Sequence, residues 1–151
     1  MLKQRIEQDL KAALLAHEAT RVSVLRSLKS AVTYAEIAQG VKGGAGLSDD
    51  AMLEVFAKEA KKRQESADVF RKNGQDERAA QETQEKAIIE HYLPAIIPED
   101  ELIVLIDEIV KRTGVSGIQS MGVVMGGVKK EAQGRVDNAL AARLVKERLQ
   151  S

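Results

Sequence analysis

The chain has 151 residues, a formal net charge of zero and no cysteine. Zero net charge argues against wholesale wrapping of nucleic acid and against a polybasic membrane anchor, and the lack of cysteine excludes disulfides, thiol nucleophiles and thiolate metal sites. Aromatic residues make up only 3%, without Trp, which argues against stacking platforms for single-stranded nucleic acid. No stretch alternates apolar and polar residues, so we expect an all-α protein without a sheet.

The first two predicted helices follow apolar residues that recur at steps of three and four. One covers residues 2–17 and places His17 on its apolar stripe. The other covers residues 20–39 and carries two apolar rows, so we expect it to be buried on two sides. Its remaining face is polar and contains Arg26, Lys29, Thr33 and Glu36.

Two further helices are predicted before the first proline. The glycine-rich segment 40–46 predicts a mobile linker, after which Ser48 should cap a third helix. That helix should end at Gly74, since glycine is the usual residue for a left-handed cap. A fourth helix should end near Tyr92, because Pro94 cannot continue it.

The segment PAIIP, residues 94–98, is the predicted domain boundary, because two prolines in five residues make a stiff connector. We therefore expect an N-terminal helical domain of four helices over residues 1–93. A small C-terminal domain of three helices should cover residues 94–151.

Helix signals in the C-terminal part define the three helices. Glu99 lies in the first turn of one helix, which Gly114 should stop. Residues 116–119, SGIQ, match a capping box and predict a second helix that Gly134 should stop. Asp137 is the predicted N-cap of the last helix.

Arg63 falls on the apolar stripe of the third helix, and a buried guanidinium without a partner is costly. Helices three and four should form a hairpin about Gly74, which lies eleven residues from both Arg63 and Glu85. This symmetry predicts an Arg63–Glu85 ion pair, with Glu82 as the alternative partner one turn away. The remaining alternative is that Arg63 extends its charged head to solvent.

Signals for catalysis are absent from the sequence. Neither His17 nor His91 lies near a Ser or carboxylate at a recognised catalytic spacing, and no HExxH motif or Walker loop occurs. We therefore expect no catalytic residue, no metal and no cofactor in this chain.

The stretch SMGVVMGGVKKEAQGRVDNALAARLV is the most informative one. It lies within residues 111–151, which carry eight bases and three acids. Gly122 and Gly126 are four residues apart and share a helix face with two lysines, although an interior glycine costs about 1 kcal/mol relative to Ala. Such a face would let an RNA backbone approach cations closely. Alternatively, the glycines only let a neighbouring helix pack. The candidate RNA-binding residues are Gly122, Gly126, Lys129, Lys130, Arg135 and Arg143.

Several motifs carry a family resemblance. The strongest are Met121-Gly122-x-Val124-Met125-Gly126 and Gly134-Arg135-x-Asp137. Tyr92-Leu93-Pro94, Lys61-x-Arg63-x-x-Ser66 and Val24-Leu25-Arg26 match as well. On these motifs the chain resembles the YqeY family over essentially its whole length, and its C-terminal part resembles the tail of the B subunit of tRNA-dependent amidotransferases (GatB).

This resemblance implies a function in tRNA recognition. The amidotransferase tail helps to select misacylated tRNA, so the implied partner is tRNA or a tRNA-containing amidotransferase or synthetase complex. The family label of a carbon–nitrogen ligase with glutamine as amido donor would need an ATP site and a Ser/Lys-type glutaminase, and neither occurs in this sequence. A relative of the tail inherits recognition, not turnover.

Three functions remain open from the sequence. The first is a tRNA-binding module, and the second is a protein adaptor that docks a partner helix on the glycine groove or on the polar face of helix 20–39. The third is a stand-alone amidotransferase or other enzyme. Acids interrupt any signal-peptide core in MLKQRIEQDL, and no run reaches the roughly 20 apolar residues of a membrane span. We therefore expect a cytoplasmic protein without a membrane partner.

Overall fold

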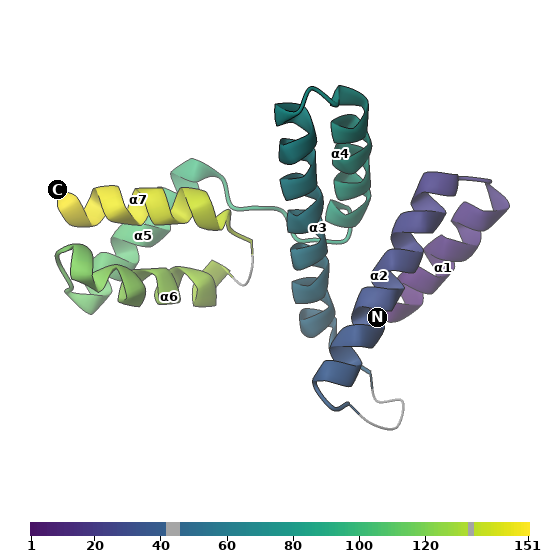
Figure 1. The fold of residues 1–151 in the computed structure, drawn as a ribbon. Helices are drawn as coiled ribbons and strands as arrows, with labels where there is room; N and C mark the ends of the chain where they lie inside the picture. The colour runs from purple at the N-terminus through teal and green to yellow at the C-terminus, as the bar shows by residue number, and fades with distance from the viewer. Residues whose placement is uncertain (42–45, 133–134) are drawn as a thin grey trace. The chain divides into compact units, whose positions relative to one another are not determined.

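A computed structural model describes residues 1–41, 46–132 and 135–151 of the chain. Over these residues the protein is all-α and contains no strand, as predicted (Figure 1). The helices are α1 (Leu2–Leu15), α2 (Ala19–Ala38), α3 (Asp49–Lys72), α4 (Asp76–Glu90), α5 (Glu99–Thr113), a short 3₁₀ turn η1 (Ile118–Ser120), α6 (Met121–Ala132) and α7 (Asn138–Gln150). The chain divides into two compact units, Met1–Leu93 and Pro94–Ser151. That each unit is an independently folding domain stays a prediction.

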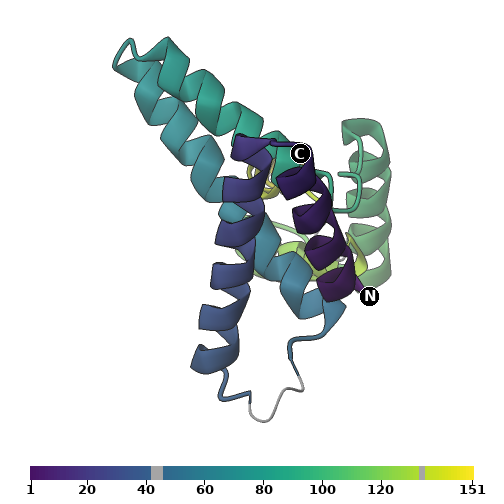
Figure 2. The ribbon, with the colours of Figure 1, turned by 90° about the vertical axis from the view of Figure 1, so that its right-hand side faces the viewer.

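The first unit consists of two helical hairpins. Figures 1 and 2 show α1 beside α2 and α3 beside α4. Helix α2 also contacts both α3 and α4, and its buried residues, Val24, Leu25, Leu28 and Val32, form one stripe. Burial of α2 on two sides stays a prediction. The shared core contains fully buried Leu25, Leu28, Phe56 and Ile89. Truncating a side chain such as Phe56 to Ala would cost about 3–5 kcal/mol.

Turns in the first unit follow the predicted signals with one exception. Ser48 is the N-cap of α3, and its side chain accepts a hydrogen bond from the Ala51 N–H at 3.2 Å. Gly74 ends the α3 segment with φ +71°, where a left-handed conformation favours glycine. The placement of His17 on an apolar stripe was wrong. Helix α1 ends at Leu15, and His17 is an exposed turn residue with φ +57°. The predicted linker lies partly outside the described residues, because positions 42–45 are not among them.

The second unit packs α5, α6 and α7 around its own apolar core. Leu102, Ile109, Val124, Val128 and Val145 are fully buried there. The helix ends follow the predicted signals, as for Gly114, which terminates α5 with φ +65°. The Asp137 carboxylate accepts hydrogen bonds from the N–H groups of Ala139 and Leu140 at the start of α7.

The predicted capping box at residues 116–119 was wrong. Gly117 has φ +82°, and the chain enters α6 through the 3₁₀ turn η1 without a side-chain cap. Instead of a capping-box bond, the Ser120 hydroxyl donates a hydrogen bond to the Ser116 carbonyl at 2.9 Å. The φ of +82° lies in a region that side-chain-bearing residues rarely adopt, so this turn favours glycine. The predicted stop at Gly134 lies outside the described residues.

Candidate functional site

The glycines of α6 divide into two kinds. A Cβ added to Gly127 would lie 3.1 Å from the Ile109 Cγ2 of α5, so this glycine permits close helix packing. A Cβ on Gly122 or Gly126 would meet no atom within 4 Å, and both residues are exposed. Helix packing within the unit therefore explains Gly127 but neither of the other two.

Two lysines share this open side of α6. Lys129 and Lys130 are exposed, and they lie three and four residues after Gly126, within one helical turn. Among the described residues, neither has a carboxylate oxygen within 4 Å of its ammonium group. We call Gly122, Gly126, Lys129 and Lys130 the α6 face. It combines an uncompensated double positive charge with a helix surface that lacks side chains.

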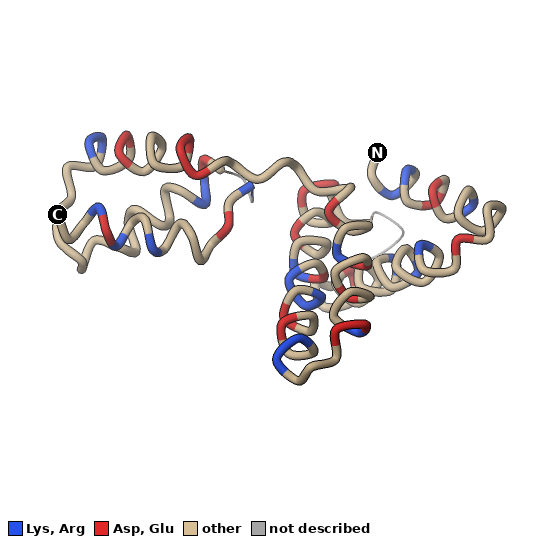
Figure 3. Tube along the Cα trace, turned by 90° about the horizontal axis from the view of Figure 1, so that it is seen from above, with Lys and Arg blue, Asp and Glu red and all other residues tan. Residues whose placement is uncertain are grey.

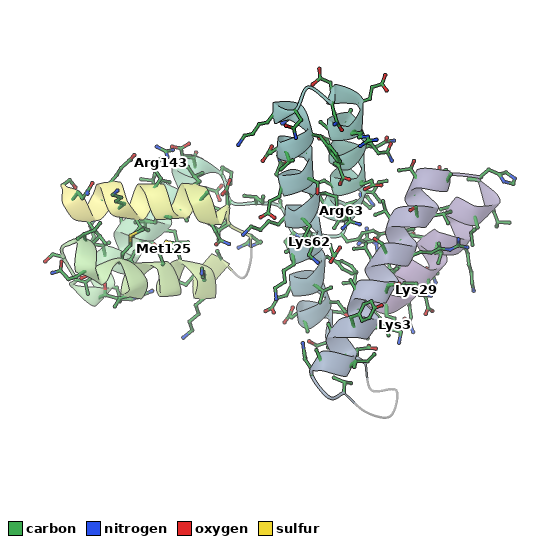
Figure 4. All side chains as sticks on the ribbon, in the orientation of Figure 1. Lys3, Lys29, Lys62, Arg63, Met125 and Arg143 are labelled. Carbon is green, nitrogen blue, oxygen red and sulfur yellow. The ribbon has the colours of Figure 1, made fainter. Side chains whose placement is uncertain are left out.

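The two arginines predicted for the same site are already engaged. Arg135 Nε donates to the Ala132 carbonyl at the end of α6 at 3.3 Å. Arg143 pairs with Glu147 at 3.2 Å and with Glu99 of α5 at 3.6 Å (Figure 4 labels it on α7). Two carboxylates offset the charge of Arg143, so it adds less to a basic surface than the α6 lysines do.

A second polar cluster surrounds Arg63 in the first unit. The predicted pair with Glu85 is present, with Arg63 Nε 3.8 Å from Glu85 Oε2. The shorter contacts went unpredicted: Nη1 lies 2.5 Å from Glu59 Oε2, and Nη2 donates to the Ser27 hydroxyl at 2.9 Å. Arg63 is only 16% exposed, so it does not extend to solvent. Its three contacts join α2, α3 and α4.

The carboxylates around Arg63 have opposite pKa shifts. Burial by itself raises the pKa of Glu59, but hydrogen bonds from Lys62 and Arg63 outweigh it and hold that pKa below its usual value. Burial and the nearby charge of Glu85 raise the pKa of Glu82. Figure 3 shows acids and bases interspersed along the α3–α4 hairpin, and the cluster forms part of this charge pattern. We interpret it as structural.

Tyr92, the penultimate residue of the first unit, is 6% exposed and contacts α1. Its hydroxyl donates to the Asp9 carboxylate, and the Arg5 guanidinium lies 4.9 Å from its ring centroid. Burial, and then the hydrogen bond to Asp9, raise the pKa of Tyr92 to about 12. Pro94 follows in the non-helical connector and is exposed. These contacts anchor the chain just before the boundary between the units.

The sequence did not predict the partners Glu59 and Ser27 of Arg63 or the partner Asp9 of Tyr92, for two different reasons. Glu59 lies four residues before Arg63 on the same helix, so the spacing itself could have indicated the pair. Ser27 and Asp9 are 36 and 83 residues from Arg63 and Tyr92, and no local pattern indicates such contacts.

The described residues show no arrangement typical of a metal centre. They contain no group of three or more His, Asp or Glu side chains arranged to hold a metal ion. None of the helices within them is long and apolar enough to cross a membrane.

Comparison with known proteins decides the family. The sequence model of the YqeY family, described as Yqey-like protein, matches residues 3–149. The chain belongs to the YqeY family. A curated relative of this YqeY chain is altered inheritance of mitochondria protein 41, mitochondrial, from Eremothecium gossypii, which is 34% identical over 91 residues. That match covers 60% of this chain and 48% of the relative, so it spans about half of the relative's length. The cytoplasmic location expected for the YqeY chain stays a prediction.

Proposed function

We propose that this YqeY-family chain is a tRNA-binding module, acting alone or beside a tRNA amidotransferase, and that the α6 face contacts the RNA backbone. The observation that carries the proposal is the exposure of Gly122 and Gly126, which no described contact inside the unit requires. They lie next to two lysines that form no ion pair among the described residues. Phosphate contacts by Lys129 and Lys130 would supply the affinity.

The exposed glycines lower the stability of α6. Gly126 lies inside the helix and costs about 1 kcal/mol relative to Ala, whereas Gly122 lies in the first turn, where the cost is smaller. A ligand backbone that lies directly on the helix offsets this loss, because it gains contacts that any side chain would block. Proteins place glycine where a phosphate backbone must approach closely, and lysines at the rim position that backbone.

The proposed role is recognition rather than turnover. Glycine and lysine at these positions provide a surface and positive charge, but they form no paired acid and base and no activated nucleophile. Any amide transfer on the bound tRNA would therefore be carried out by a partner enzyme.

A charge-reversal experiment tests the site. Lys129→Glu combined with Lys130→Glu should weaken binding of fluorescently labelled tRNA about tenfold or more, as measured by anisotropy at fixed salt. Lys111→Glu with Lys146→Glu is the matched control, because it changes the charge equally at exposed lysines of the same unit. Equal losses in both variants would point to non-specific attraction, and unchanged binding in the α6 variant would overturn the proposal.

A further inference from the structure

The α1–α2 hairpin carries a hollow that the proposed tRNA contact does not use. It has a volume of about 500 Å³ and is lined by Leu14, His17, Ala19, Val22, Ser23 and Arg26. Apolar side chains thus form much of the lining, while Arg26 and His17 provide basic groups beside them. Leu14 is 45% exposed and adds apolar surface at the edge of the hollow.

The same side of α2 continues as an exposed stripe beyond the hollow. Lys29, Ser30 and Thr33 follow Arg26 at helical spacing, and Figure 4 labels Lys29 on α2. The stripe ends in two large apolar side chains, Tyr34 at 74% exposure and Ile37 at 70%. We call the lining of the hollow together with Lys29, Ser30, Thr33, Tyr34 and Ile37 the α2 face.

The two cations of the α2 face, Arg26 and Lys29, form no direct ion pair among the described residues. Within α2 the one acid is Glu36, and its Oε1 accepts a hydrogen bond from the Leu47 N–H at 3.3 Å. Arg21 is paired with Glu18 and Asp9. Arg26 and Lys29 have no carboxylate within 4 Å among the described residues. Two positive charges that form no ion pair among the described residues therefore lie beside an apolar surface.

We infer that the α2 face docks an acidic amphipathic helix of a partner protein. Its cations match acidic side chains, and Leu14, Val22, Tyr34 and Ile37 match an apolar stripe. RNA fits less well, because a phosphate backbone gains little from aliphatic side chains. Residues 22–37 rise about 22 Å along α2, so the partner segment would be about four helical turns, or 15 residues.

This inference does not depend on the proposed tRNA contact. The α2 face belongs to the first unit and the α6 face to the second. Each can fail by experiment while the other stands.

A peptide selection on the full-length chain tests the inference without a known partner. Random 16-residue peptides displayed on phage are selected against immobilised protein, and the enriched sequences are synthesised for anisotropy titration. We expect enrichment of Asp and Glu together with Leu, Ile or Phe at spacings of three and four. Arg26→Glu with Lys29→Glu should weaken binding of these peptides at least tenfold, whereas Lys129→Glu with Lys130→Glu should leave it within twofold.

A second variant checks the apolar part of the face. Ser23→Trp places a large ring at the exposed edge of the hollow and should weaken the selected peptides while circular dichroism keeps its helical signal. The inference is overturned if the selected peptides lack acids, or if neither α2 variant changes their affinity. It is also overturned if Arg26→Glu with Lys29→Glu abolishes tRNA binding and leaves peptide binding intact, because the face would then belong to RNA.

Discussion

The α2 and α6 faces each present two cations that form no ion pair within the part of the chain that the structure describes, yet they differ in what surrounds those cations. On α6 the lysines adjoin two glycines whose Cβ positions are open space. On α2 the cations adjoin a hollow with an apolar lining and two exposed large side chains. Charge alone therefore does not distinguish the two surfaces. The residues next to the cations determine whether the surface fits the phosphate backbone of an RNA or the apolar side chains of a partner protein.

The largest expected effect is on stability, and it comes from replacing Arg63, whose side chain binds Ser27 of α2. Arg63→Met leaves Glu59 and Glu85 without their cation and removes the bond to Ser27 of α2. We expect the free energy of unfolding to fall by about 2 kcal/mol, which is less than the roughly 3–5 kcal/mol for breaking a fully buried pair, because Arg63 is partly solvated. Urea denaturation measures the loss. Unchanged stability would show that the cluster is not structural.

The next largest difference should be in how ligand affinity at each face depends on salt concentration. If two phosphates contact Lys129 and Lys130, tRNA affinity should fall about tenfold between 50 and 200 mM salt. Peptide binding to the α2 face should change only a few-fold, since apolar burial is not screened. Anisotropy titrations over this range give both slopes. Equal slopes would mean that the apolar lining of the α2 face contributes little.

Alanine substitutions distinguish the glycines of α6. Gly126→Ala should stabilise the protein by about 1 kcal/mol, because the added methyl group meets open space. Gly127→Ala should give no such gain, since its Cβ would press on Ile109 at 3.1 Å. Thermal unfolding compares the two variants. Gly126→Ala should also weaken tRNA binding, and a variant that is more stable with unchanged affinity would contradict the assigned role of the face.

The smallest effect concerns the two tyrosines, one on the α2 face and one buried. In a Tyr34→Phe variant the remaining tyrosine is Tyr92, whose ultraviolet titration should have a midpoint near 12. The raised folded-state pKa means that its contribution to stability is complete below about pH 10 and is lost as the pH rises toward 12. Asp9→Asn should lower the midpoint. A midpoint of 10 in both proteins would show that the Asp9 contact does not form in solution.

Local signals predicted most of the helix ends, and they failed where backbone conformation competed with them. Ser48, Gly74 and Asp137 act at the predicted positions because a cap depends on a few neighbouring residues. The capping box at 116–119 failed because Gly117 adopts a left-handed conformation that starts a 3₁₀ turn. His17 was placed inside α1 because its spacing fitted the apolar stripe, although the helix ends before it.

The sequence by itself determined the all-α class, the family and the residues of the α6 face, because periodicity and motifs are local properties of the chain. Only the tertiary structure decided which glycine packs against Ile109 and which two face open space. It likewise assigned Glu59 and Ser27 to Arg63 and supplied carboxylates for Arg143. These outcomes depend on which helices lie side by side, and no spacing within one helix specifies that.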